Sequence, residues 1–292
     1  MIQVILGGLV TSLLTLAAVW TVEGRGVTVM GWYLDYVIPI GGLGVGLAAS
    51  SGYGVASWLR GVKISGRLLA VIFAIQVGVY FAASWIQYAT YSPVYPDGTP
   101  VSFATFFDAT TRAFAFAGKD GKGGTPYGVF GYFFRALEVG GFCLGSLIAP
   151  FALKGRAYCD SCSLYMLGAK SAMLAASVPF AKAKKGDAQA AALHEAAQRA
   201  AYEQAIAALD ALHGLAEAND ASGFRDRVKE VEVPGRAAQK LPQRIAVALS
   251  RCPRCESGEM RTTLWSGHGQ QQRSRELGRS ALAQFFARNV AG

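Results

Sequence analysis

The sequence predicts a mainly α-helical protein: a four-helix transmembrane bundle, followed by a cytosolic metal-binding module with a long inserted helical hairpin and a C-terminal amphipathic helix. Two observations predict this class. Of the 292 residues, 52% are hydrophobic and only 16% are charged, which is too apolar for an ordinary soluble domain. The apolar residues concentrate in the first half of the chain, and the second half contains two Cys-x-x-Cys pairs.

Four apolar stretches make up the predicted transmembrane domain, 1–153, because each is long enough to cross a bilayer. They cover residues 2–22, 31–59, 68–88 and 127–153. No Lys or Arg precedes the first stretch and no evident cleavage site follows it, so we expect a retained helix and not a removed signal peptide. The outer loop, 92–125, contains an amphipathic helix with aromatic residues at helical spacing: Phe103, Phe106, Phe107 and Phe114.

Basic residues between the spans predict the orientation. Arg60, Lys63 and Arg67 follow the second span, and Lys154 and Arg156 follow the fourth. The positive-inside rule places these loops, and with them both termini, in the cytosol. We therefore expect a multi-pass protein of the bacterial cytoplasmic (inner) membrane. The net charge of +9 fits basic inner loops against anionic lipid, and fits a nucleic-acid partner less well.

Small residues recur along the second and fourth spans. They predict helices whose backbones approach closely, with a hinge or a pore wall as the alternative. The residues concerned are Gly42, Gly46, Ser50 and Gly54 in the second span and Gly141 and Gly145 in the fourth. Pro39 lies within the second span and is expected to kink it.

Arg135 and Glu138 lie one helical turn apart in the fourth span. Charges within a span are costly, so this pair should face the bundle or a wet cavity. One interpretation is an internal ion pair that fixes the rotation of the helix. The other is an ion or proton site.

Four cysteines organise the second half of the chain: Cys159, Cys162, Cys252 and Cys255. A Cys-x-x-Cys turn brings two thiolates to one metal ion, and two such turns give a tetrahedral site. Alternating stretches at 244–249 and 260–265 flank the second pair and predict a hairpin. Disulfides are not expected, because the predicted topology places these cysteines in the reducing cytosol.

The knuckles CDSC and CPRC, with their hairpins, resemble the zinc-ribbon superfamily. The resemblance covers only the four cysteines and the strands around them. It implies a structural Zn²⁺ site without an open position for substrate, and a rubredoxin-like iron site or another use of the thiols remains an alternative. Because 90 positions separate Cys162 from Cys252, a further segment must be inserted between the two halves.

These features predict the boundaries of the cytosolic part. The first ribbon half covers 154–168, the inserted helical segment 169–241, the second ribbon half 242–268, and a basic amphipathic helix 269–292. We expect this last helix to lie on the inner leaflet or on a partner.

Function is less specified than fold. No catalytic array stands out, so the sequence favours a non-enzymatic membrane anchor or adaptor that presents the zinc-stabilised domain to a cytosolic protein, as a homo-oligomer or as a subunit of a larger membrane complex. The alternative is a small transporter or channel subunit that uses Arg135 and Glu138. A nucleic-acid-contacting ribbon ranks third: Arg251, Arg254 and Arg261 permit it, but positive-inside bias explains them equally well.

Overall fold

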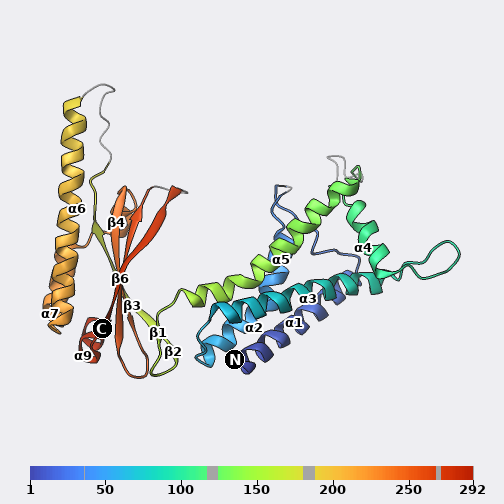
Figure 1. Cartoon of the computed structure of the whole chain (residues 1–292), viewed down its shortest axis with the longest axis horizontal. Coiled ribbons are helices and arrows are strands. Elements are labelled where there is room, and N and C mark those ends of the chain that lie inside the picture. The colour runs from blue at the N-terminus through green and yellow to red at the C-terminus, as the bar shows by residue number, and fades with distance from the viewer. Residues whose placement is uncertain (36, 117–123, 180–187, 268–270, 292) are drawn as a thin grey trace. The chain divides into compact units, whose positions relative to one another are not determined.

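The computed structural model describes residues 1–35, 37–116, 124–179, 188–267 and 271–291 (Figure 1). The chain divides into two compact units, Met1–Arg156 (unit 1) and Ala157–Gly292 (unit 2). Unit 1 is helical, and both β-sheets found in the described residues belong to unit 2.

Unit 1 contains five α-helices and one short 3₁₀ helix within its described residues. These are α1 (Ile2–Glu23), α2 (Ile40–Leu59), α3 (Gly66–Tyr91), α4 (Phe103–Arg112), η1 (Gly128–Phe130) and α5 (Gly131–Lys154). Among the helices described, α1, α3 and the continuous η1–α5 segment are long and apolar enough to cross a membrane, which indicates a membrane protein. The second predicted span corresponds to α2, which is not one of these candidates because its six glycines and three serines dilute its apolar residues.

The second predicted span, 31–59, is wrong at its start. Helix α2 begins at Ile40, and Pro39 is its N-cap residue and not a kink. The proline ring cannot follow a helical turn, and it restricts Ile38 before it to an extended conformation. The preceding residues form a tight turn instead, in which the Leu34 amide donates to the Ile38 carbonyl at 2.8 Å.

Helix α2 packs against both α1 and α5; the predicted glycines of α2 face α5, whereas Gly52 makes the close contact with α1. A Cβ atom added at Gly46 would lie 2.1 Å from the Phe142 carbonyl oxygen, and one added at Gly145 would lie 2.2 Å from the Leu43 oxygen. Backbone therefore touches backbone, as expected where dispersion contacts drive helix association. The other predicted positions share this seam: Gly42, Ser50, Gly54 and Gly141 are buried in α2 or α5.

Unit 2 is built on a four-stranded antiparallel sheet in the order β3-β4-β5-β6. Its elements are β1 (Tyr158–Cys159), β2 (Leu164–Tyr165), β3 (Leu167–Ala175), α6 (Ala188–Glu217), α7 (Ala221–Val231), α8 (Gly235–Ala238), β4 (Gln243–Arg251), β5 (Gly258–Ser266), β6 (Arg273–Leu282) and α9 (Gln284–Ala291). Alternate residues of the strands face helices α6, α7 and α9. The core formed there includes Leu174, Leu209, Leu212, Phe224, Ile245, Met260 and Phe286.

Two predicted boundaries in unit 2 are wrong. The inserted segment, 169–241, is not wholly helical, because most of β3 lies inside it and pairs with β4. The tail predicted as one helix, 269–292, forms in its described residues a strand, β6, followed by a short helix, α9. Pairing with β5 satisfies the backbone groups along one side of β6, while Phe286 and Val290 of α9 bury their side chains in the core and are not available to a lipid leaflet.

Candidate functional site

The four predicted ligands come together at one end of the sheet in unit 2. The sulfur atoms of Cys159, Cys162, Cys252 and Cys255 all lie within 4.8 Å of one another, and the Cys159 and Cys255 sulfurs are 3.6 Å apart. Around a tetrahedral ion with metal–sulfur bonds of about 2.3 Å, the sulfurs lie roughly 3.8 Å apart. The arrangement therefore fits a metal ion held by four thiolates. None of the cysteines forms a disulfide.

Strand pairing explains how cysteines so distant in sequence meet. Residues Leu167 of β3 and Arg251 of β4 are paired in the sheet, so the chain passes directly from the first cysteine pair into β3 and from β4 into the second pair. Helices α6, α7 and α8 connect the opposite ends of the same two strands. The length of the insert consequently has no influence on the spacing of the sulfurs.

The two knuckles share one backbone conformation. Ser163 and Glu256 each follow the second cysteine of their pair, and their φ angles are 53° and 59°. This left-handed conformation turns the chain sharply enough for both sulfurs of a pair to face the same point. In the second knuckle, the Glu256 amide also donates to the Cys252 carbonyl at 3.1 Å.

The surroundings of the Cys255 sulfur suit a thiolate, whereas the neighbouring Cys255 sulfur raises the pKa of Cys162 to about 12 as long as no ion lies between the sulfurs. Cys159 and Cys252 are buried and pack with Ala157 and Met166. The Ser257 hydroxyl lies 3.0 Å from the Cys255 sulfur, and hydrogen bonds from this hydroxyl and from the Ser257 amide lower the pKa of Cys255 to about 6. Donors around metal-bound sulfur orient the ligand and stabilise its charge. A tetrahedral ion held by all four sulfurs would have no open position for a substrate.

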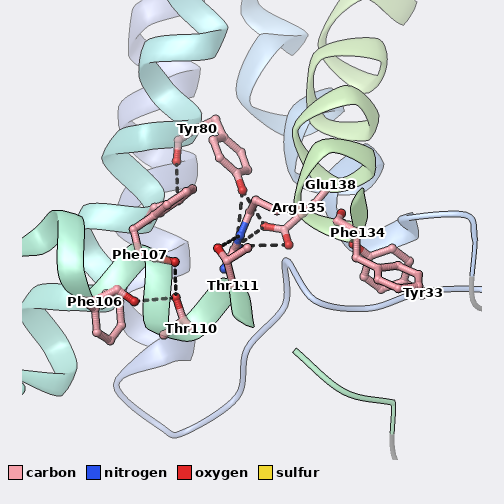
Figure 2. Close-up of polar contacts among 10 residues, drawn as sticks. Tyr33, Tyr80, Phe106, Phe107, Thr110, Thr111, Phe134, Arg135 and Glu138 are labelled. Carbon is pink, nitrogen blue, oxygen red and sulfur yellow. Dashed lines mark hydrogen bonds and ion pairs between the residues drawn. The ribbon is translucent and has the colours of Figure 1, made fainter. Parts of the chain in front are cut away.

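The predicted intramembrane pair forms a closed network in unit 1 (Figure 2). Arg135 Nη1 lies 3.1 Å from Glu138 Oε1, and the Tyr80 hydroxyl donates to the same carboxylate oxygen at 3.0 Å. Arg135 Nε donates to Thr111 Oγ1 at 3.2 Å, and the guanidinium lies 4.9 Å from the centre of the Phe107 ring. Three helices thus converge on Arg135, which supports the interpretation as an internal ion pair.

Helix α4 supplies the outer part of this network and is the amphipathic helix expected in the loop 92–125. Its phenylalanines pack on aromatic residues of α3, with Phe103 5.1 Å from Trp85 and Phe106 5.5 Å from Tyr88 between ring centres. Phe114 lies beyond the helix and stacks on Phe134 of α5. The helix is therefore fixed against unit 1, because its apolar face is already covered.

Sequence reasoning missed Glu23. It is the last residue of α1, and the first predicted span, 2–22, ends just before it. In the structure it is only 4% exposed and lines a cavity together with Arg135 and Glu138. The available signal was that Glu23 directly follows the apolar stretch and is the first charged residue of the chain.

No protein-family model, curated protein or solved structure matches this chain.

Proposed function

We propose that the protein is a non-enzymatic membrane anchor or adaptor, which carries a metal-stabilised domain beside the bilayer and presents it to a protein partner. The observation that carries the proposal is the closed set of four thiolates at the end of the sheet. A site of this kind contributes folding free energy and does not polarise or activate a substrate. Unit 2 is then a scaffold whose purpose is the surface that it displays.

The metal that we propose is Zn²⁺. Four thiolates in two knuckles are the ligand set of structural zinc, although iron uses the same set. Elemental analysis of the purified full-length chain should give one zinc per chain. Visible absorption from an iron–thiolate centre would instead assign the site to iron.

The sheet of unit 2 offers a surface for a partner on the face that alternates away from the helices. Paired positions across the strands place Met173, Ala246 and Thr263 in one row on this face. Trp265 lies one row further along, with the Arg244 guanidinium 5.7 Å from its ring centre. Ala246 and Thr263 are small, Trp265 is large and rigid, and Met173 is flexible; all four are partly exposed, whereas Arg244 is buried. Apart from Met173, these side chains can contact a partner without a large loss of side-chain entropy.

Affinity purification of the full-length chain from gently solubilised membranes tests the proposal. We expect a protein partner to co-purify in a fixed ratio, and Thr263→Arg to release it while leaving one zinc bound, because the new side chain obstructs the sheet face. Thr105→Arg, an equivalent exposed change on α4, is the matched control and should retain the partner.

A wild-type chain that purifies as a monomer without any partner would contradict the adaptor role. Equal recovery of the partner by Thr263→Arg and by the wild type would exclude this face as the contact surface.

A further inference from the structure

A polar cavity lies at the end of unit 1 where α1 and α3 finish and α5 begins. Its volume is about 160 Å³. A water molecule occupies roughly 30 Å³ of liquid volume, so the cavity has room for an ion with several waters. The polar side chains that line it include Glu23, Ser84, Gln87, Thr110, Arg135 and Glu138.

Glu23 is the carboxylate in this cavity whose hydrogen bonding is incomplete, although Thr28, which also lines the cavity, hydrogen-bonds to its side chain. The side chain is 4% exposed, and its Oε2 atom has no hydrogen-bond partner among the residues described. By contrast, Glu138 accepts from both Tyr80 and Arg135. A buried carboxylate oxygen without a partner is costly, so a native structure that retains one calls for an explanation.

The charges around the cavity do not balance. Two carboxylates, Glu23 and Glu138, face one guanidinium, Arg135, which the Glu138 pair already engages. The ionised site therefore carries one excess negative charge in surroundings of low dielectric constant. A single positive charge placed in the cavity restores neutrality.

We propose that this cavity binds one small monovalent cation, with Glu23 as its principal ligand. The donors available are those that hard cations prefer: carboxylate oxygens, the Ser84 hydroxyl and the Gln87 amide oxygen. The guanidinium of Arg135 disfavours a divalent ion, because the site would then carry a net positive charge. The site is independent of the adaptor role and of the metal held by the cysteines.

Thermal unfolding of the full-length chain in lipid nanodiscs tests the proposal. The readout is tryptophan fluorescence in a Trp265→Phe background, which leaves only tryptophans of unit 1: Trp20, Trp32, Trp58 and Trp85. Chlorides of Li⁺, Na⁺, K⁺ and methylammonium are compared at one ionic strength with N-methylglucamine, which is too large for the cavity. We expect one of the small cations to raise the unfolding temperature saturably, by about 3–6 °C at ten times its dissociation constant.

Variants of Glu23 provide the decisive comparison. Glu23→Gln should unfold in N-methylglucamine at or above the wild-type temperature, because the buried charge is gone, and should show no response to the small cation. Glu23→Asp, which keeps the charge on a shorter side chain, should respond only at higher concentration. Glu195→Gln is the matched control, because Glu195 is an exposed residue of unit 2, and it should respond like the wild type.

Two results would overturn the proposal. One is a wild-type unfolding temperature that is the same in every salt, which would mean that no small cation binds in the cavity. The other is an undiminished response in Glu23→Gln, which would place the cation elsewhere.

Discussion

In unit 1 the backbones of neighbouring helices touch, whereas in unit 2 large side chains and four sulfurs fill the space between the elements. The contact between α2 and α5 depends on missing side chains, as at Gly46 and Gly145. The contact between the sheet and its helices depends on bulky ones, such as Phe224 and Phe286, whose ring centres are 5.2 Å apart. We attribute this difference in packing to the surroundings of each unit, which are lipid for the helices of unit 1 and water for unit 2.

Water drives apolar side chains together, so a unit in water gains stability with each large side chain that it buries. Lipid provides no such drive, so helices in a membrane are held by close approach and by polar pairs. Unit 1 has both of these, in its glycine seam and in the Arg135–Glu138 pair. If this comparison is right, a change in one unit should leave the other unit folded.

Removal of the metal should have the largest effect. Structural zinc contributes about 10–16 kcal/mol of apparent binding free energy at pH 7, and acid weakens it because protons compete for the thiolates. Cys252→Ser, or treatment with a chelator, should unfold unit 2 and expose it to proteolysis, while α1–α5 remain helical by circular dichroism.

Cys143→Ser is the control for this experiment, because Cys143 is a buried thiol of α5 in unit 1 and not a ligand. It should retain one metal ion per chain. A Cys252→Ser chain with normal metal content and an intact unit 2 would refute the four-thiolate site.

Loss of the ion pair in unit 1 should have the next largest effect. Arg135→Gln leaves Glu138 without its counter-charge, and the side chains of the two residues are only 16% and 5% exposed. Breaking a buried pair in this way costs about 3–5 kcal/mol. Tryptophan fluorescence should report the loss, while the metal content stays unchanged.

The double variant Arg135→Gln, Glu138→Gln should recover part of this stability, since no charge of the pair is then left unpaired. If the stability lost by the double variant equalled the sum of the losses in the two single variants, the two side chains would act independently, which would contradict the contacts described here.

A methyl group in the glycine seam should have a smaller effect. Gly46→Ala places a Cβ atom 2.1 Å from the Phe142 carbonyl oxygen, so α2 and α5 must separate, and overpacking of this kind typically costs about 1–3 kcal/mol. Gly44→Ala in the same helix meets nothing within 4 Å and serves as the control. Equal unfolding temperatures for the two variants would exclude close packing as the role of Gly46.

The smallest expected effect is an increase in the stability of unit 2. Ser163 has a φ of 53°, which an L-residue adopts at a cost and glycine adopts freely. Ser163→Gly should therefore raise the stability of unit 2 by roughly 0.5 kcal/mol, after the greater flexibility of glycine in the unfolded chain is subtracted. Ser163→Ala retains the unfavourable conformation, so it should not stabilise unit 2. Chelator titrations measure the effect, because a more stable unit 2 retains its metal at a higher chelator concentration.

Local patterns in the sequence predicted the parts that local physics determines. Apolar runs predicted α1, α3 and α5, and the spacing of Cys252 and Cys255 predicted a knuckle between two strands. The close approach of α2 and α5 was also predictable, because small residues every fourth position form a continuous face.

The errors concern pairing and burial over long distances. The arginines of β6 suggested a basic helix, but the free edge of β5 decides the conformation of this segment, and a single sequence does not reveal that edge. Glu23 escaped notice for a related reason. Its burial depends on helices α3 and α5, which follow it by many residues.

The distance between the cysteine pairs has a consequence for protein synthesis. When the ribosome has made Cys162, the first pair has only two thiolates to offer, and Cys255 follows 93 residues later. At about 5–20 residues per second, that interval is roughly 5–20 s. A metal ion can therefore be locked in place only after α6, α7 and β4 have been translated, so loading of the metal marks a chain whose insert is complete.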